Sequence, residues 1–363
     1  MSTPHPIDVP QLRERVQAAL DEDLTHQRAV LDELGPQASR LVDEVAALLT
    51  GGKRLRAAFL FWGYRALGGP DSSALIRAAS SMEMFQAAAL LHDDVMDESD
   101  VRRGRPTAHR TFAADHQQQA WSGESDRFGH AAAILAGNLC LTWCDSMFAT
   151  SGLRQDEIAS ARSEFDNMRT QLMAGQYLDV LDAAQGWEGL DYDERIRRCR
   201  TVIRYKSGKY SVEQPLLIGA RAAGAGPDTL AGLSAYGLAL GEAFQIRDDI
   251  LGVYGDPAAT GKPAGDDLRE GKRTVLVAHA LGLGSDEDAA VLLDCLGRPD
   301  LSDEQVGVCR ELLERVGAVR ATEEMISRSS GAALRALEET DGLTDEGRAA
   351  LVELVSISTA RST

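Results

Sequence analysis

The sequence contains little cysteine and no long uninterrupted hydrophobic run. Its 363 residues include five cysteines, no two of which form a C-x-x-C pair. This is not the pattern of a disulfide framework or a zinc site, so we expect buried, reduced thiols. No apolar stretch approaches the ~20 residues that span a bilayer, and the first residues lack a signal segment. We therefore expect a soluble cytoplasmic protein with no integral membrane segment.

Positive charge is also scarce in this chain. There are 38 lysines and arginines against 56 aspartates and glutamates, which gives a formal net charge of −18. Nucleic-acid binding requires a basic surface, so we expect no nucleic-acid partner. An anionic substrate has to be met locally, by metal ions and a few basic side chains, against an unfavourable overall field.

Strand-like alternation is rare, and apolar residues recur at helical spacing through most of the chain. The pattern predicts an all-α fold, with residues 36–363 forming one large bundle-like domain after an N-terminal extension, residues 1–35, that carries an amphipathic helix. Residues 117–127, rich in Gln, Ser and Gly, read as a surface loop. The expected helices span about 37–49, 54–67, 72–99, 129–150, 155–184, 191–206, 209–223, 228–252, 267–283, 303–315 and 319–339.

The most informative stretch runs from Leu90 to Thr107, where an apolar helix leads into clustered carboxylates and then arginines. Asp93 and Asp97 are four residues apart, so on a helix they share one face and can bind hard cations through oxygen. Arg102 and Arg103 follow where the helix should end, and guanidinium groups there can bind phosphate oxygens in pairs. This order suggests a metal-bridged diphosphate, although an acidic, solvated helix end remains a plain alternative.

A second acidic pair, Asp248 and Asp249, also follows an apolar helix in which Gly237 and Gly241 permit close packing. Two acidic helix ends can face one another only if cations lie between them, because carboxylates that close repel strongly. An all-oxygen ligand set favours Mg²⁺ or Mn²⁺ over zinc.

Basic residues occur in small groups around these motifs. The pair Gly51-Gly52 precedes Lys53, Arg54 and Arg56 just before a helix, a pattern that suits an anion site but also an ordinary solvated loop. Further groups contain Lys206 with Ser207, Lys262, and Lys272.

The ordered series G-G-K-x-x-R, D-D-x-x-D followed by R-R-G, K-S-G, F-Q-x-x-D-D, and G-K with D-D-x-x-x-G-K resembles the polyprenyl synthetase family over residues 36–340. Its members are trans-isoprenyl diphosphate synthases, and the chain looks most like the bacterial geranylgeranyl diphosphate synthases. The resemblance implies the all-α isoprenoid synthase fold around a deep central cavity, a homodimer, and three Mg²⁺ ions, with Mn²⁺ as a substitute. It also implies a prenyltransferase of isoprenoid (terpenoid) biosynthesis.

The family's functional residues map onto this chain position by position. Asp93, Asp97 and Asp248 match metal ligands, and Asp94 and Asp249 match residues that support the metals. The allylic diphosphate contacts match Arg102, Lys206, Ser207, Gln245, Lys262 and Lys272. The contacts to isopentenyl diphosphate match Lys53, Arg56, Gln86 and Arg103. Two positions depart from the family pattern: Gly252 replaces a frequent third aspartate, and Asn138 replaces a frequent aspartate.

The implied reaction condenses isopentenyl diphosphate with dimethylallyl, geranyl or farnesyl diphosphate, 1'-4 and head to tail, and releases diphosphate. Ala88 and Ala89, one helical turn before Asp93, would form the floor of the chain-length cavity, with Phe85 one turn deeper and Trp143 or Met147 on a neighbouring helix. An aromatic residue at this floor stops growth near fifteen carbons in the family. Two alanines therefore favour a C20 product, geranylgeranyl diphosphate, over farnesyl diphosphate, with C25 or longer as the competing outcome.

Three other functions compete with this interpretation. A class I terpene cyclase also ionises an allylic diphosphate but does not need the second basic set. A metal phosphohydrolase is suggested by His92-Asp93, yet the chain has no histidine between His26 and His92 to complete its ligands. A non-catalytic partner subunit typically loses an acidic motif, whereas both motifs remain here.

Overall fold

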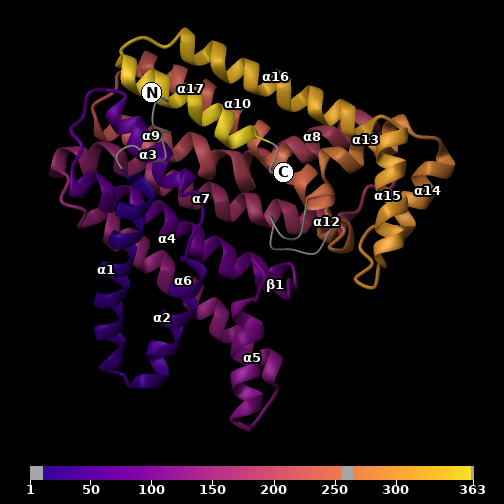
Figure 1. The fold of residues 1–363 in the computed structure, drawn as a ribbon, viewed down its shortest axis with the longest axis horizontal. Coiled ribbons are helices and arrows are strands. Elements are labelled where there is room, and N and C mark those ends of the chain that lie inside the picture. Colours follow the sequence, from indigo (N-terminus) through magenta and orange to yellow (C-terminus); the bar gives the residue numbers. More distant parts are fainter. Residues whose placement is uncertain (1–10, 256–264, 361–363) are drawn as a thin grey trace. The chain divides into compact units, whose positions relative to one another are not determined.

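The computed structural model describes residues 11–255 and 265–360, and most of these residues are helical (Figure 1). The chain forms two compact units. The first comprises the described residues up to Arg162 together with Ile218–Ala225, and the second comprises Ser163–Leu217 together with the described residues from Gly226 onward. Two of the three boundaries between the units fall inside helices, α7 (Gln155–Gln185) and α9 (Gln214–Ala222), and the third falls between Ala225 and Gly226, just after α9.

The first unit is built on a helix that is buried on almost every side. This helix, α4 (Ser73–Met96), begins at the N-cap Ser72, whose hydroxyl accepts a hydrogen bond from the Leu75 amide at 3.1 Å. It packs mainly on α6, with α1 and α3 on other sides. The unit's other elements are α1 (Leu12–Asp32), α2 (Pro36–Leu48), α3 (Leu55–Arg65), β1 (Val101–Arg102), β2 (Arg105–Pro106), α5 (Ala108–Gln118) and α6 (Ser125–Ala149).

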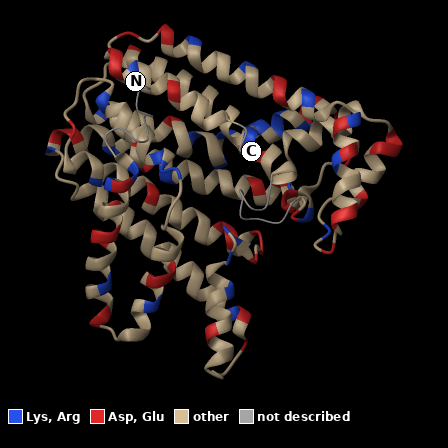
Figure 2. Cartoon of the chain, in the orientation of Figure 1, with Lys and Arg blue, Asp and Glu red and all other residues tan. Residues whose placement is uncertain are grey.

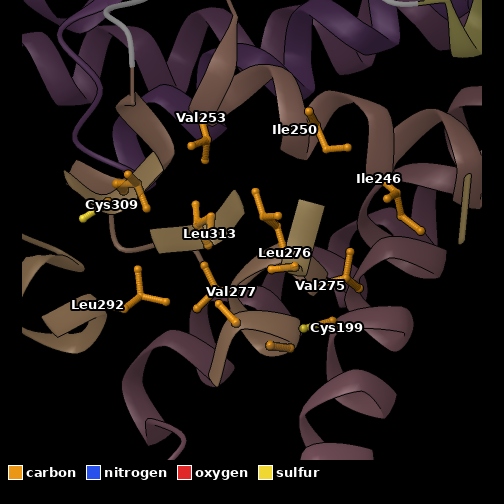
Figure 3. Packing of buried hydrophobic residues seen from close by; sticks show 14 of the residues in the cluster. Cys199, Ile246, Ile250, Val253, Val275, Leu276, Val277, Leu292, Cys309 and Leu313 are labelled. Carbon is orange, nitrogen blue, oxygen red and sulfur yellow. The ribbon is translucent and has the colours of Figure 1, made fainter. Parts of the chain in front are cut away.

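The second unit is organised around α10 (Pro227–Tyr254), which packs against η1 (Ile203–Glu213) and α16 (Ala318–Glu338). A cluster of aliphatic side chains, including Ile246, Ile250 and Leu276, fills the space between α10 and the C-terminal helices (Figure 3). The remaining helices are α8 (Tyr192–Val202), α12 (Asp266–Arg269), α13 (Val275–Leu283), α14 (Asp286–Cys295), α15 (Asp303–Arg315) and α17 (Asp345–Thr359).

The all-α prediction is confirmed, and the differences lie in local detail. The chain does not break between residues 206 and 209 but continues as the π-helix η1. The helix expected over 267–283 is two helices, α12 and α13, separated by residues 270–274. The expected loop over 117–127 shrinks to residues 119–124, and α5, α14 and α17 were not predicted. These three helices are short and amphipathic, so packing stabilises them more than propensity does.

The N-terminal extension contributes packing to the first unit. Leu12, Val16, Leu20 and Leu24 of α1 are buried on one face of the helix, which contacts α2 and α4. The division of the chain into an extension over residues 1–35 and one domain over 36–363 remains a prediction. The five cysteines are all free and buried, as expected.

One described helix, α6, is long and apolar enough to cross a membrane by length and composition. Half of its most apolar window is buried inside the protein, which is how the core helix of a globular unit also behaves. Ile134 and Leu135 of this helix remain exposed.

We predict that Gly241→Ala destabilises the second unit. A Cβ at residue 241 would lie 2.6 Å from the Gly208 carbonyl oxygen, so α10 and η1 would have to separate. The expected loss is about 1–3 kcal/mol, seen as a lower Tm in thermal denaturation. Gly307→Ala on α15 is the matched control, because nothing lies within 4 Å of its added Cβ. It should be neutral or stabilising, and a Gly241→Ala protein as stable as the wild type would contradict this account.

Candidate functional site

The first acidic motif lies in the last turn of α4. Asp94 is buried, with 3% of its surface exposed, while Asp93 and Asp97 are half-buried. Asp97 caps the helix through its amide, which donates to the Asp93 carbonyl at 2.8 Å. Arg102 contacts this helix end: its Nε and Nη2 lie 2.8 and 2.6 Å from Asp94 Oδ1, and Nη2 lies 3.7 Å from Asp93 Oδ2. Arg102, which follows the acidic motif in the sequence, therefore contacts that motif in the structure.

The two arginines of this motif lie on a β-hairpin rather than on a helix end. Arg102 pairs with Arg105 across the antiparallel strands, and Arg103-Gly104 form the turn with φ of 52° and 72°. Two successive left-handed residues are the signature of a tight hairpin turn. The hairpin gives the two neighbouring arginines different partners. Opposite charges meet where the hairpin approaches the end of α4 (Figure 2).

Arg103 belongs to a basic cluster that we define as Lys53, Arg54, Arg56 and Arg103. Arg103 Nη1 donates to the Leu48 carbonyl at 3.2 Å, so the hairpin turn lies at the end of α2. The pKa of the Arg103 guanidinium is lowered by desolvation and then by the positive charges of Arg102, Arg54 and Arg56. This crowding of positive charge is what a bound anion would relieve.

The other candidates on α4 take up the positions that helical spacing predicts. Gln86, two turns before Asp93, is half-buried. Phe85 and Ala88 are buried, and Ala89 is half-buried. Trp143 and Met147, the deeper candidates, are buried on α6, the helix that packs most closely on α4.

The ring of His92 also packs against α6. Its Nε2 lies 3.2 Å from the Ile134 carbonyl oxygen. That contact engages one of the two ring nitrogens that could bind a metal. Asn138, the second departure from the family pattern, is exposed on α6, and its backbone carbonyl accepts a hydrogen bond from Thr142.

The second acidic motif lies in the penultimate turns of α10. Asp248 is exposed and Asp249 is buried, with Gln245 Nε2 donating to Asp249 Oδ1 at 2.9 Å. The pKa of Asp249 is raised to about 8, mainly by burial and to a lesser extent by the negative charges of Asp267 and Asp248. The hydrogen bond from Gln245 and the charge of Lys272 act in the opposite direction. A carboxyl held this way among like charges has a strong electrostatic preference for a nearby cation.

Asp267 occupies the space that a side chain at position 252 would need. A Cβ added to Gly252 would lie 1.9 Å from Asp267 Oδ2 and 2.3 Å from its Cγ. Gly252 is four residues after Asp248, so it lies on the same side of α10. The carboxylate that the motif lacks at position 252 is thus supplied to the same place by Asp267 on α12, and Lys272 Nζ lies 3.4 Å from it. Asp267 is part of the D-D-x-x-x-G-K motif, but the sequence alone gave no signal for this role.

Lys206 of η1 has a partner that the sequence analysis also missed. Its Nζ lies 2.6 Å from Oδ2 of Asp179 on α7, and Ser207 beside it is half-buried. Asp179 stands among other acidic residues of a long helix, so its spacing alone gave no signal. Lys262 lies outside the described residues.

No three His, Cys, Asp or Glu side chains converge as a metal-binding group anywhere in residues 11–255 and 265–360. Asp93 and Asp97 belong to the first unit, and Asp248 belongs to the second. The donors nevertheless suit a hard divalent cation, because they are carboxylate oxygens and Asp249 is buried beside the charges of Asp248 and Asp267.

Comparisons with known proteins agree on one family. The polyprenyl synthetase family model matches residues 39–314. Geranylgeranyl pyrophosphate synthase of Corynebacterium glutamicum, solved with isoprenyl diphosphate and magnesium, has a TM-score of 0.90 and 37% identity, covering 97% of this chain and 99% of that chain. Geranylfarnesyl diphosphate synthase of Aeropyrum pernix is 35% identical over 296 residues, 75% of this chain and 86% of the relative. Geranylgeranyl diphosphate synthase of Sulfolobus acidocaldarius is 31% identical over 268 residues, 73% and 74% of the two chains.

We predict that Gly252→Asp alone destabilises the protein and that Asp267→Gly in the same chain relieves the loss. The single change forces two carboxylates and their atoms into one space, at a cost of about 1–3 kcal/mol. The double change leaves one carboxylate there, now carried by α10. Thermal denaturation of both variants, with Asp267→Gly alone as the control, measures the effect. If Gly252→Asp melts at the wild-type temperature, Asp267 does not fill that space.

Proposed function

The chain belongs to the polyprenyl synthetase family and is a trans-prenyl diphosphate synthase with the all-α isoprenoid synthase fold, and we propose that it makes geranylgeranyl diphosphate (C20). In the proposed reaction, isopentenyl diphosphate condenses with an allylic diphosphate, 1'-4 and head to tail, and diphosphate is released. Dimethylallyl, geranyl and farnesyl diphosphates are the proposed allylic substrates.

The observation that carries the proposed condensation reaction is that the adjacent residues Arg102 and Arg103 contact different partners. A condensing enzyme has to hold two diphosphates, whereas a class I terpene cyclase holds one. Arg102 lies on the acidic end of α4, where it can contact a metal-bound diphosphate. Arg103 lies with Arg54 and Arg56 in the basic cluster, a second anion site beside it. Two distinct cationic positions in one unit favour condensation over cyclisation.

We propose that Asp93, Asp97 and Asp248 bind Mg²⁺, three ions in all, with Mn²⁺ as a substitute, while Asp94 and Asp249 support them. The solved Corynebacterium relative holds magnesium, and the carboxylate donors of this chain fit the same class of ion. The chemistry that such ions supply is stabilisation of negative charge on a departing diphosphate. Asp267 provides a further carboxylate beside Asp248 and Asp249 of the second motif.

The side chains then divide between two substrates. For the allylic diphosphate we propose Arg102, Lys206, Ser207, Gln245, Lys262 and Lys272. For isopentenyl diphosphate we propose Lys53, Arg56, Gln86 and Arg103. The positive side chains of the first set stabilise the diphosphate as its C–O bond breaks, and those of the second hold the double bond in line with the allylic cation. The proton lost from the product passes to the departing diphosphate, so no side chain acts as a nucleophile.

The proposed product length rests on Ala88 and Ala89 as the cavity floor, with Phe85 one turn deeper. The small side chains let a chain grow past fifteen carbons, and the buried Phe85, Trp143 and Met147 offer bulk beyond them. The relatives are named as geranylgeranyl and geranylfarnesyl diphosphate synthases. A C25 or longer product is accordingly the competing outcome.

We also propose a homodimer that acts in the cytoplasm. Support for the dimer comes from α6, an apolar helix whose Ile134 and Leu135 are nevertheless exposed at 43% and 56%. A second copy packed on this face would remove them from water.

Labelled isopentenyl diphosphate, incubated with each allylic substrate and Mg²⁺ and followed by product sizing, tests the function directly. A C20 product from all three allylic substrates is expected. Release of a hydrocarbon or alcohol from farnesyl diphosphate alone would support a cyclase instead. No product from any substrate would support a non-catalytic subunit.

We predict that Ala88→Phe shortens the product toward C15. The phenyl ring would fill the floor one turn before Asp93 and stop elongation. Ala88→Gly is the control, because it adds no bulk and should leave the length unchanged or longer. Since Ala88 is fully buried, Ala89→Phe at the half-buried neighbouring position provides a second test in case the first variant folds poorly. Unchanged product length in both aromatic variants would remove these residues from the floor.

We predict that Arg103→Ala raises KM for isopentenyl diphosphate by about 10- to 100-fold, because a charge-assisted contact of ~1.5–3 kcal/mol is lost. KM for the allylic diphosphate should stay within about twofold. Steady-state kinetics with each substrate varied in turn makes the comparison. Arg105→Ala, an exposed arginine on the other strand of the same hairpin, is the control and should change neither constant. Equal increases for both substrates would contradict the assignment of Arg103 to one subsite.

A further inference from the structure

Arg54 is buried in the middle of the basic cluster. It lies in the loop of residues 49–54, between the exposed Lys53 and the first turn of α3, and only 5% of its surface is exposed. Its φ of 55° is left-handed, a conformation that an arginine adopts only when its surroundings impose it. Arg54 is the N-cap residue of α3, yet its side chain caps nothing there. Something other than local sequence preference must hold this loop.

Three contacts hold the Arg54 side chain. It donates to the Leu49 carbonyl at the start of the same loop. Its Nη2 donates to Gln17 Oε1 of α1 at 2.5 Å, and its Nη1 lies 3.5 Å from Glu83 Oε2 of α4. The loop is therefore tied through one guanidinium to two helices that are distant in sequence.

Glu83 provides the cap that Arg54 does not. Its Oε1 accepts a hydrogen bond from the Ala57 amide at 3.0 Å, in the first turn of α3. An N-terminal amide of a helix has no partner within the helix, and a carboxylate there also interacts well with the helix dipole. The charge of the same carboxylate works against the lowering of the Arg103 pKa, so it offsets part of the repulsion among the clustered cations. Glu83 thus fixes both ends of the short segment that contains Arg56.

Helix α1 does not depend on Gln17 for its own position. Arg77 of α4 lies 2.8 Å from the buried Asp23, and Arg15 forms two hydrogen bonds to Asp71 at 2.7 and 2.9 Å. Leu12 and Val16 bury the apolar face of the helix. Gln17 Nε2 also donates to Asp21 Oδ1 at 2.8 Å, but that bond lies within α1. Loss of the Gln17 amide should therefore leave α1 in place and remove one partner from Arg54.

We propose that Gln17 and Glu83 are positioning residues: through Arg54 they hold the loop of residues 49–54 so that Lys53 and Arg56 face the diphosphate of isopentenyl diphosphate. The second turn of α1, which holds Gln17, is then part of the support of this subsite. The proposal rests on the proposed function for the identity of the anion, but the network itself is independent of it.

Gln17→Ala is the main test, because Gln17 is half-buried and the packing of α1 does not need it. Hydrogen–deuterium exchange of the full-length protein should show the amides of residues 50–57 exchanging several-fold faster, with α1 and α4 unchanged. In steady-state kinetics KM for isopentenyl diphosphate should rise about three- to tenfold, while kcat and KM for the allylic diphosphate stay within about twofold. Gln17→Glu keeps an oxygen acceptor for Arg54 and should restore both readouts.

Gln27→Ala is the matched control. Gln27 is a half-buried glutamine of the same helix whose amide bonds only to Asp23 within α1 in the described contacts, at 3.5 Å, so neither readout should change. Wild-type exchange rates at residues 50–57 in Gln17→Ala, or no recovery in Gln17→Glu, would overturn the proposal. A wild-type enzyme that does not use isopentenyl diphosphate would instead refute the proposed function, and the exchange measurement would still decide whether Gln17 holds the loop.

Discussion

The contact between Arg102 and the buried Asp94 fixes the arrangement of the first unit's charged groups. A carboxylate removed from water requires a charged partner or hydrogen bonds, and the guanidinium provides both at 2.6 and 2.8 Å. This contact secures the β-hairpin to the end of α4. Arg103 is in the tight turn of the hairpin, so its side chain contacts a different element and lies at the end of α2, beside the loop of residues 49–54. As a result, Arg102 lies at the acidic end of α4 and the adjacent Arg103 lies in the basic cluster.

An acidic protein has to concentrate its positive charge to hold diphosphates. In a chain with a net charge of −18, Arg54 and Arg56 lie close enough to Arg103 to lower its pKa, and Lys53 precedes Arg54 directly in the sequence. The positive charges of this cluster repel one another, and the negative charge of the buried Glu83 reduces that repulsion. Lys53 remains exposed. The inferred role of Gln17 extends the same principle: a neutral acceptor on α1 satisfies Arg54 without cancelling another charge.

The second unit concentrates negative charge, because three carboxylates lie close together near the end of α10. Asp249 is buried beside Asp248 and Asp267, and its pKa is raised mainly by that burial and further by the two neighbouring negative charges. Gly252 departs from the third aspartate that the resemblance to the family implies at this position of the motif. The structure instead fills that volume with Asp267 from α12. The proposed Mg²⁺ site therefore has a third carboxylate that reaches α10 from another segment of the chain.

The sequence by itself determined the all-α fold, the family, and the residue types of both acidic motifs, because helical periodicity and motif spacing are local properties of the chain. It did not reveal the hairpin that separates Arg102 from Arg103, the pairing of Lys206 with Asp179, or the place of Asp267 beside Gly252. It left residues 1–35 without a role, whereas α1 contacts Arg54 through Gln17. The tertiary structure alone decided these points, because each depends on packing between segments whose order along the chain says nothing about their distance in space.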